Sequence, residues 1–121
     1  GAICVSGPSW EEDRGYAARL AADPAVAAWP LVALVDDAEA SAQDARSFLW
    51  HVFTRFEPGA DVHAARTEVV RNQVARTAPI VLDARMKSWM PKVVEADPAT
   101  VALVDRRWRE YFPARGAGAR L

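Results

Sequence analysis

Three aspartates follow short apolar runs, and they are the residues best placed to do chemistry. Asp36 and Asp37 come directly after Leu31–Val35, and Asp83 comes directly after Ile80–Leu82. Because ligands of parallel α/β sheets gather at the carboxyl ends of strands, three carboxylates there could hold Mg²⁺. Aspartates at strand ends more commonly begin loops and cap the turns that follow. We therefore favour capping over a metal site for these residues.

The other reactive side chains lack the spacing that catalysis or metal binding needs. His51 and His63 are the two histidines, and no HxxxH or CxxC pattern occurs, so the sequence predicts no zinc site. Cys4 fits a small core residue, and Ser47 has no nucleophile-elbow context. The six glycines form no phosphate-binding loop. We expect no self-sufficient catalytic, cofactor-binding or metal-binding set in this chain.

Composition favours one soluble domain with a substantial core. The 121 residues are 51% hydrophobic and include five tryptophans. The net charge is −1 with both signs mixed along the chain, which does not indicate nucleic-acid or membrane binding. No apolar run approaches the roughly 18 residues of a membrane span, and GAICVSG lacks the pattern of a signal peptide. A single cysteine excludes an internal disulfide and fits a reducing cytoplasm.

A βαβ unit is expected to position the first aspartates. Ala2–Ser6 is a short apolar run typical of a strand. Ser9 and Glu12 have the spacing of a capping box, which predicts a helix that continues to about Ala22. The next strand is Leu31–Val35. Two strands joined through a helix imply a right-handed crossover and parallel pairing.

The helix predicted after the acidic pair is unusually aromatic. It runs from about Ala42 to Phe56 and ends before Pro58-Gly59. Since it is apolar over more than half its circumference, one sheet face cannot bury it, and another helix or a partner subunit should cover the rest. The surplus large apolar residues could pack within the monomer or form a subunit or interdomain face. They are Trp50, Phe53, Trp89 and Met90.

The second half of the chain supplies another strand and a last helix. Residues 62–78 fit either a helix or an extended arm, and we favour extended structure. Ile80–Leu82 is a third apolar strand, and Lys87–Lys92 is a loop. Asp97-Pro98 is a strong helix start, which predicts a helix over Pro98–Phe112. The predicted fold is α/β: one small domain over residues 1–113, with a mostly parallel sheet built from βαβ units, flanking helices, a C-terminal helix and a flexible tail over residues 114–121.

The aspartates also give a resemblance to the receiver domain of response regulators. There an acidic pair ends an early strand and a phosphoacceptor aspartate, here Asp83, ends a later one. A receiver needs two further strands beyond the phosphoacceptor, whereas the 38 residues after Asp83 contain one good helix and no clear strand. A receiver-like signalling module is therefore an alternative, as is an unrelated small α/β interaction protein.

Four ordered motifs carry a broader resemblance, over about residues 31–113. They read VALVDD, FLWHVFTRFEPGADVH, IVLDARMK and ADPATVALVDRRWREYFP. Together they resemble the C-terminal domain of the UbiD-type decarboxylases, the 4-hydroxy-3-polyprenylbenzoate decarboxylase family. The matching residues are Val35, Asp36, Asp37, Leu49, Trp50, Thr54, Arg55, Pro58, Leu82, Asp83, Ala84, Arg85, Lys87, Val104, Asp105, Arg106, Arg107 and Trp108.

The resemblance implies a reversible, non-oxidative decarboxylase of aromatic or α,β-unsaturated acids that uses prenylated FMN with a divalent metal and a monovalent cation. In that family the flavin and the catalytic Glu-Arg-Glu set lie in the preceding domain, of which this sequence contains no counterpart. The C-terminal domain mediates oligomerisation and helps to close the substrate pocket. Residues 62–78 depart from the family, which has a longer Gly/Pro-rich, apolar segment there, so we carry over no pocket contact from them.

From the resemblance we expect a domain or small subunit that is inactive alone and binds no cofactor by itself. Its partner would be a flavin-binding domain or large subunit, within a homo- or hetero-oligomer. The candidate motif and interface residues are Asp36, Asp37, Trp50, Thr54, Arg55, Asp83, Arg85, Lys87 and Trp108.

Overall fold

The computed structural model of the chain describes residues 1–112. The chain divides into two compact units, one over Gly1–Met90 and the other beginning at Pro91. The tail expected over residues 114–121 lies outside the described residues, and the single domain expected over residues 1–113 stays a prediction. Each unit is described by itself below.

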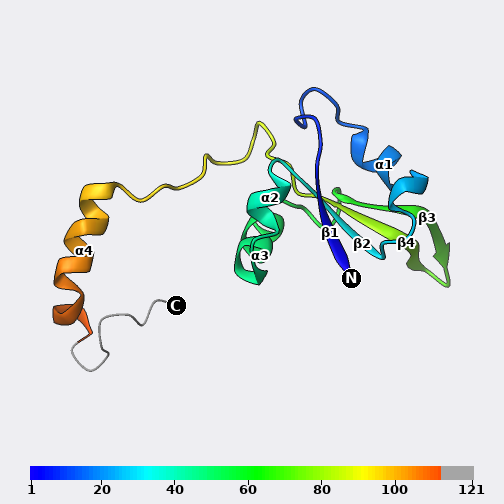
Figure 1. The fold of residues 1–121 in the computed structure, drawn as a ribbon. Coiled ribbons are helices and arrows are strands. Elements are labelled where there is room, and N and C mark those ends of the chain that lie inside the picture. Colours follow the sequence, from blue (N-terminus) through cyan, green and yellow to red (C-terminus); the bar gives the residue numbers. More distant parts are fainter. Residues whose placement is uncertain (113–121) are drawn as a thin grey trace. The chain divides into compact units, whose positions relative to one another are not determined.

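The first unit is built on a four-stranded sheet (Figure 1). Its strands are β1 (Ala2–Ser6), β2 (Leu31–Val35), β3 (Val62–Val70) and β4 (Gln73–Asp83), and their spatial order is β1-β2-β4-β3. The pairs β1–β2 and β2–β4 are parallel, and β3–β4 is antiparallel. The expected α/β fold with a mostly parallel sheet is confirmed. The parallel pairing places the carboxyl ends of β2 and β4 side by side, with Leu34 opposite Asp83.

The two faces of β2 are buried by different helices. Val32 and Leu34 pack in one cluster with Ala17 and Leu20 of α1 (Tyr16–Ala21). Ala33 and Val35 pack in a second cluster that includes Val52 of α3 (Ala45–Phe53), Leu82 and Ala84. Because successive strand residues point to opposite faces, the continuous apolar run of β2 fits a strand covered on both sides. A short 3₁₀ turn, Pro24–Val26, follows α1.

Two predicted helix starts differ from the structure. Glu12 does reach back to Ser9 N (3.0 Å), as the capping box predicted, but the Ser9 hydroxyl donates to the same carboxylate (2.8 Å) and the helix begins only at Tyr16. The helix expected from about Ala42 to Phe56 forms as α3 and begins at Ala45, because the Asp44 carboxylate accepts from Ser47 N (2.7 Å) and caps the helix there. A separate short helix that was not predicted, α2 (Ala38–Ser41), precedes it.

The exposure expected for the aromatic helix is confirmed within the first unit. The side chains of Leu49, Trp50 and Phe53 on α3 remain 55%, 61% and 55% exposed. Trp89 is also exposed, while Met90 is partly covered. One sheet face therefore does not bury α3, as its composition indicated.

Residues 62–78 are extended, as predicted, and they form more structure than expected. β3 and β4 continue beyond the rest of the sheet as a two-stranded ribbon, and β4 extends back from the predicted strand Ile80–Leu82 to Gln73. The ribbon closes through Arg71 and Asn72, whose φ angles are 51° and 63°. Two positive φ angles are typical of the type I′ turn, whose twist matches that of the flanking strands.

The second unit contains α4 (Pro98–Tyr111). The predicted start is confirmed: the Asp97 carboxylate accepts from Thr100 N (2.9 Å), and Pro98 occupies the first turn. The apolar side chains of α4 are not buried. Across residues 1–112, no helix has both the length and the apolar character needed to cross a membrane.

Candidate functional site

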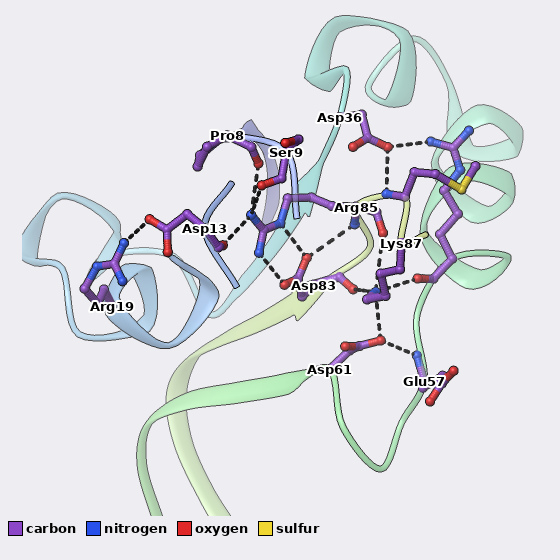
Figure 2. A network of polar contacts seen from close by, with 12 residues as sticks. Pro8, Ser9, Asp13, Arg19, Asp36, Glu57, Asp61, Asp83, Arg85 and Lys87 are labelled. Carbon is purple, nitrogen blue, oxygen red and sulfur yellow. Dashed lines mark hydrogen bonds and ion pairs between the residues drawn. The ribbon is translucent and has the colours of Figure 1, made fainter. Parts of the chain in front are cut away.

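A polar network lies at the carboxyl ends of β2 and β4 (Figure 2). We define the strand-end network by six charged side chains, contributed by the ends of both strands, the end of α3 and the loop before β3: Asp36, Arg55, Asp61, Asp83, Arg85 and Lys87. Asp83, Arg85 and Lys87 are at most 1% exposed. Burying charge is costly unless each group is paired and hydrogen-bonded, so these partners are essential to the local structure.

Arg85 joins the end of β4 to a distant loop. Its Nε and Nη2 atoms donate to the two carboxylate oxygens of Asp83 at 2.8 and 2.7 Å. Its Nη1 atom donates to the carbonyl oxygens of Pro8 (2.9 Å) and Asp13 (3.0 Å), with Ser9 O at 3.4 Å. The hydrogen bonds to Asp83 raise the pKa of the Arg85 guanidinium above its usual value. The planar fork of Arg is suited to this bidentate contact, and a lysine could not reproduce it.

Lys87 ties three further segments together. Its Nζ atom lies 2.9 Å from Asp61 Oδ2 and donates to Arg55 O (3.0 Å), at the end of α3, and to Asp83 O (2.9 Å). Asp61 also accepts from Glu57 N at 2.8 Å. The ammonium is thus fully occupied by the end of a helix, the end of a strand and a loop carboxylate.

Asp36 is held at the rim of the network. Its Oδ2 atom accepts from Arg55 Nη1 and from Met86 N, both at 2.9 Å. Asp37, its neighbour, instead accepts from Ala40 N (2.9 Å) and caps α2. The capping favoured from the sequence is therefore confirmed for Asp37.

The network fixes a loop that presents aromatic side chains to solvent. Trp89, 56% exposed, makes an edge-to-face contact with Trp10 at 4.8 Å between ring centroids. The Arg14 guanidinium lies over the Trp10 ring, 4.5 Å from its centroid. A hydrogen bond from Ser88, together with Arg14, holds the pKa of Glu11 below its usual range. The side chains of loops 8–14 and 84–90 that are not buried form a surface that we call the aromatic loop face.

The structure brings together five of the nine candidate residues. Asp36, Arg55, Asp83, Arg85 and Lys87 belong to the strand-end network. The remaining four lie elsewhere. Trp50 and Thr54 lie on and after α3, where the Thr54 hydroxyl donates to Trp50 O; Asp37 caps α2, and Trp108 belongs to the second unit.

The strand-end network is better suited to holding the loop after β4 in place than to acid–base or metal chemistry. Asp83 is matched by Arg85, and Asp36 by Arg55. Within residues 1–112, no three His, Cys, Asp or Glu side chains are grouped so as to hold a metal ion, and no buried side-chain nitrogen or oxygen lacks a partner. The shared Mg²⁺ site considered for Asp36, Asp37 and Asp83 is thus not formed by the described residues.

The receiver-like alternative does not fit these observations. Asp83 is 1% exposed and both of its oxygens bind Arg85, whereas a phosphoacceptor must be reached by a phosphoryl donor. No strand follows Asp83 in the part of the chain up to residue 112.

Sequence reasoning missed the partners that make the network complete. The carbonyls of Pro8 and Asp13 and the carboxylate of Asp61 carry no motif. Lys87 follows the last residue of β4 by four residues, and lysines at such positions are commonly solvated, so no signal in the sequence pointed to Asp61 as its partner.

The chain matches no known protein-family model, but it is similar to segments of longer chlamydial proteins. It is 43% identical over 94 residues to an uncharacterised protein of Chlamydia trachomatis, and 40% identical over 90 residues to one of Chlamydia caviae. It is also 40% identical over 90 residues to a Chlamydia pneumoniae protein that is named as a subunit of 4-hydroxybenzoate decarboxylase. These matches cover 78%, 74% and 74% of this chain and 16%, 16% and 15% of the relatives. The chain thus spans about one sixth of the length of these relatives.

Proposed function

We propose that this chain is an assembly and pocket-closing part of a UbiD-like decarboxylase, whose reaction takes place on a flavin-bearing domain or subunit. One observation carries the proposal: the buried charges of the strand-end network are used internally, and their effect is to hold the aromatic loop face in place. A loop held in this way offers a fixed surface for another part of an enzyme to contact. The similarity to a protein named as a decarboxylase subunit supports this choice of enzyme.

The buried cations of the strand-end network do not fit prenylated FMN. A flavin phosphate needs several hydrogen-bond donors, and the donors of Arg85 and Lys87 are already occupied by protein oxygens. A hollow of about 540 Å³ lies beside β1, but Asp44 and Phe48 are among its lining residues and no cation is. We therefore assign the flavin and its metal ions to the partner.

In this proposal the chain holds the loop at residues 84–90 in position and helps to exclude water from the substrate pocket. Lys87 and Arg85 hold residues 84–90 against the sheet, so Trp89 and Met86 keep one placement when the partner approaches. A preorganised loop loses little conformational entropy on binding. Closing such a face over a pocket would remove water from around a substrate carboxylate. The substrate class is aromatic or α,β-unsaturated acids.

A domain exchange tests this proposal. The chain would replace the matching segment of the Chlamydia pneumoniae relative, and CO₂ release from 4-hydroxybenzoate would be measured with prenylated FMN supplied. We expect no release from the isolated chain or from the relative without that segment, and restored release from the chimera. Trp89→Ala in the chimera should lower release while leaving bound flavin unchanged, and Val94→Ala, at another exposed position, should leave both unchanged. CO₂ release by the isolated chain, or a folded, flavin-loaded chimera without activity, would refute the proposal.

A further inference from the structure

The outer edge of β3 is not paired with another strand of the described residues. In residues 1–112, β3 is the last strand of the sheet and pairs with β4 on one side only. Its nine residues contain no proline or lysine, and Val69 and Val70 are 70% and 50% exposed. An unpaired strand edge offers N–H and C=O groups to another strand, and the charges of Arg66 and Glu68 on β3 restrict which strand fits. The Ala64/Arg66 irregularity is the one break in its register with β4.

The ribbon turn determines which backbone groups face outward. In a hairpin closed by a two-residue turn, the flanking residues exchange hydrogen bonds, here Val70 and Gln73. The alternation along an antiparallel strand then directs the N–H and C=O groups of Thr67 and Val69 away from β4. A second strand can therefore pair with β3 only in a register that places its own N–H and C=O groups opposite those of Thr67 and Val69.

The charges on β3 distinguish between the symmetric registers. Arg66 and Glu68 are two residues apart on one face, and their side chains are 72% and 45% exposed. An antiparallel pair centred on Thr67 places Arg66 of each copy opposite Glu68 of the other. Centring on Arg66 would oppose two arginines, and centring on Glu68 would oppose two glutamates. Opposite charges across strands stabilise a pair and like charges destabilise it, so β3 is complementary to itself in one of these registers.

We propose that β3 pairs antiparallel with β3 of a second copy, with Thr67 on the two-fold axis, and so joins two sheets into one. The ion pair within each copy, Arg66 with Glu68 at 2.8 Å, is exposed and contributes little, so the two side chains are free to re-pair across the axis. The interface is isologous, as expected for a homodimer. This inference deepens the assembly role proposed above and rests on it, but it arises from residues 62–70, where the chain departs from the UbiD pattern.

Charge exchange in the full chain tests the register. Arg66→Glu opposes two acidic pairs and Glu68→Arg opposes two basic pairs, so each variant should raise the dimer dissociation constant at least about tenfold in analytical ultracentrifugation. Mixing the two variants restores opposite charges at both positions, and a heterodimer should form with close to native affinity. Far-UV circular dichroism checks that each variant is folded.

A disulfide provides a second measurement that does not depend on charge. Residues paired across an antiparallel ladder have Cα atoms about 5.5 Å apart at hydrogen-bonded positions, within the range a disulfide spans. Thr67→Cys should therefore form a covalent dimer on mild oxidation. Val69→Cys is the matched control, because the two copies of residue 69 would lie about 14 Å apart along the strands. The native chain, with Cys4 alone, controls for that thiol.

The results separate this inference from the proposed function. A chain that stays monomeric at about 100 μM, or a dimer that neither charge variant weakens, would overturn pairing through β3. If that happened while the chimera still released CO₂, the decarboxylase role would stand without this interface. If Thr67→Cys cross-links efficiently while the folded chimera is inactive, pairing through β3 would stand and the decarboxylase role would be refuted.

Discussion

The strand-end network and the β3–β4 ribbon, defined here as residues 66–77, distribute polarity in opposite ways. In the network, the charged side chains of Asp83, Arg85 and Lys87 are buried and fully paired. In the ribbon, the aliphatic side chains of Val69 and Val74 are 70% and 56% exposed. Folded chains commonly bury valine and expose lysine. Both regions reverse that preference, and the reversal has a different cause in each.

The network is complete within one chain, while the ribbon is not. Each buried charge in the network meets an opposite charge or a carbonyl from the same unit. The ribbon has an unpaired strand edge and little apolar cover, and a two-stranded ribbon alone is only marginally stable in water. The comparison therefore assigns the network to positioning within the chain and the ribbon to contact with another chain.

The largest expected effect is the loss of a buried partner from the network. Arg85→Met would leave Asp83 as an uncompensated buried carboxylate and the carbonyls of Pro8 and Asp13 without their donor. We expect the free energy of unfolding to fall by about 3–5 kcal/mol, measured by urea denaturation. The double variant with Asp83→Asn should lose less than the sum of the two single losses, because the pair is coupled. A loss below about 1 kcal/mol for Arg85→Met would show that the network is not a structural element.

A smaller effect is expected from valine truncation, and it compares buried with exposed aliphatic side chains directly. Val52 is fully buried under the sheet and Val69 is 70% exposed on the ribbon. Val52→Ala should lower the free energy of unfolding by about 2 kcal/mol through lost burial and a cavity. Val69→Ala should change it by less than about 0.5 kcal/mol, measured at low protein concentration where the chain is monomeric. Equal losses at both positions would mean that the ribbon valines are covered within one chain.

Most elements formed by residues close together in the sequence were predicted, whereas most contacts between residues far apart in the sequence were not. The strands β1 and β2 and the start of α4 were predicted because each is coded locally, by an apolar run or by Asp97-Pro98. The short helix α2 was missed because its four residues carry no apolar pattern, and α3 begins after Asp44, three residues later than predicted. The ribbon was predicted only as extended structure, since its register requires the pairing partner.

The candidate site was predicted in part for the same reason. The motif Asp83-Ala84-Arg85-Met86-Lys87 singled out three residues that do lie together in the network. Its burial was not predictable, because Arg85 meets Pro8 and Asp13 across more than seventy residues of chain. Lysine and arginine after a strand end are commonly solvated, so composition alone favoured exposure.

The smallest expected effect is a pH response in the loop that Arg85 holds. The Ser9 hydroxyl, with Ser9 N–H, hydrogen-bonds the Glu12 carboxylate and keeps its pKa below the usual 4.5. A lowered pKa in the folded chain gives stabilisation that is present above pH 4.5 and lost as the pH falls through the folded value. Acidification should therefore loosen residues 9–12 and shift the indole N–H signal of Trp10 in NMR spectra. Glu12→Gln keeps an acceptor but does not titrate, so the part of the shift due to Glu12 should disappear. An unchanged shift in that variant would mean that the order of residues 9–12 depends on Arg85 and not on the Ser9–Glu12 contacts. The contrast between buried and exposed charge would then be stronger.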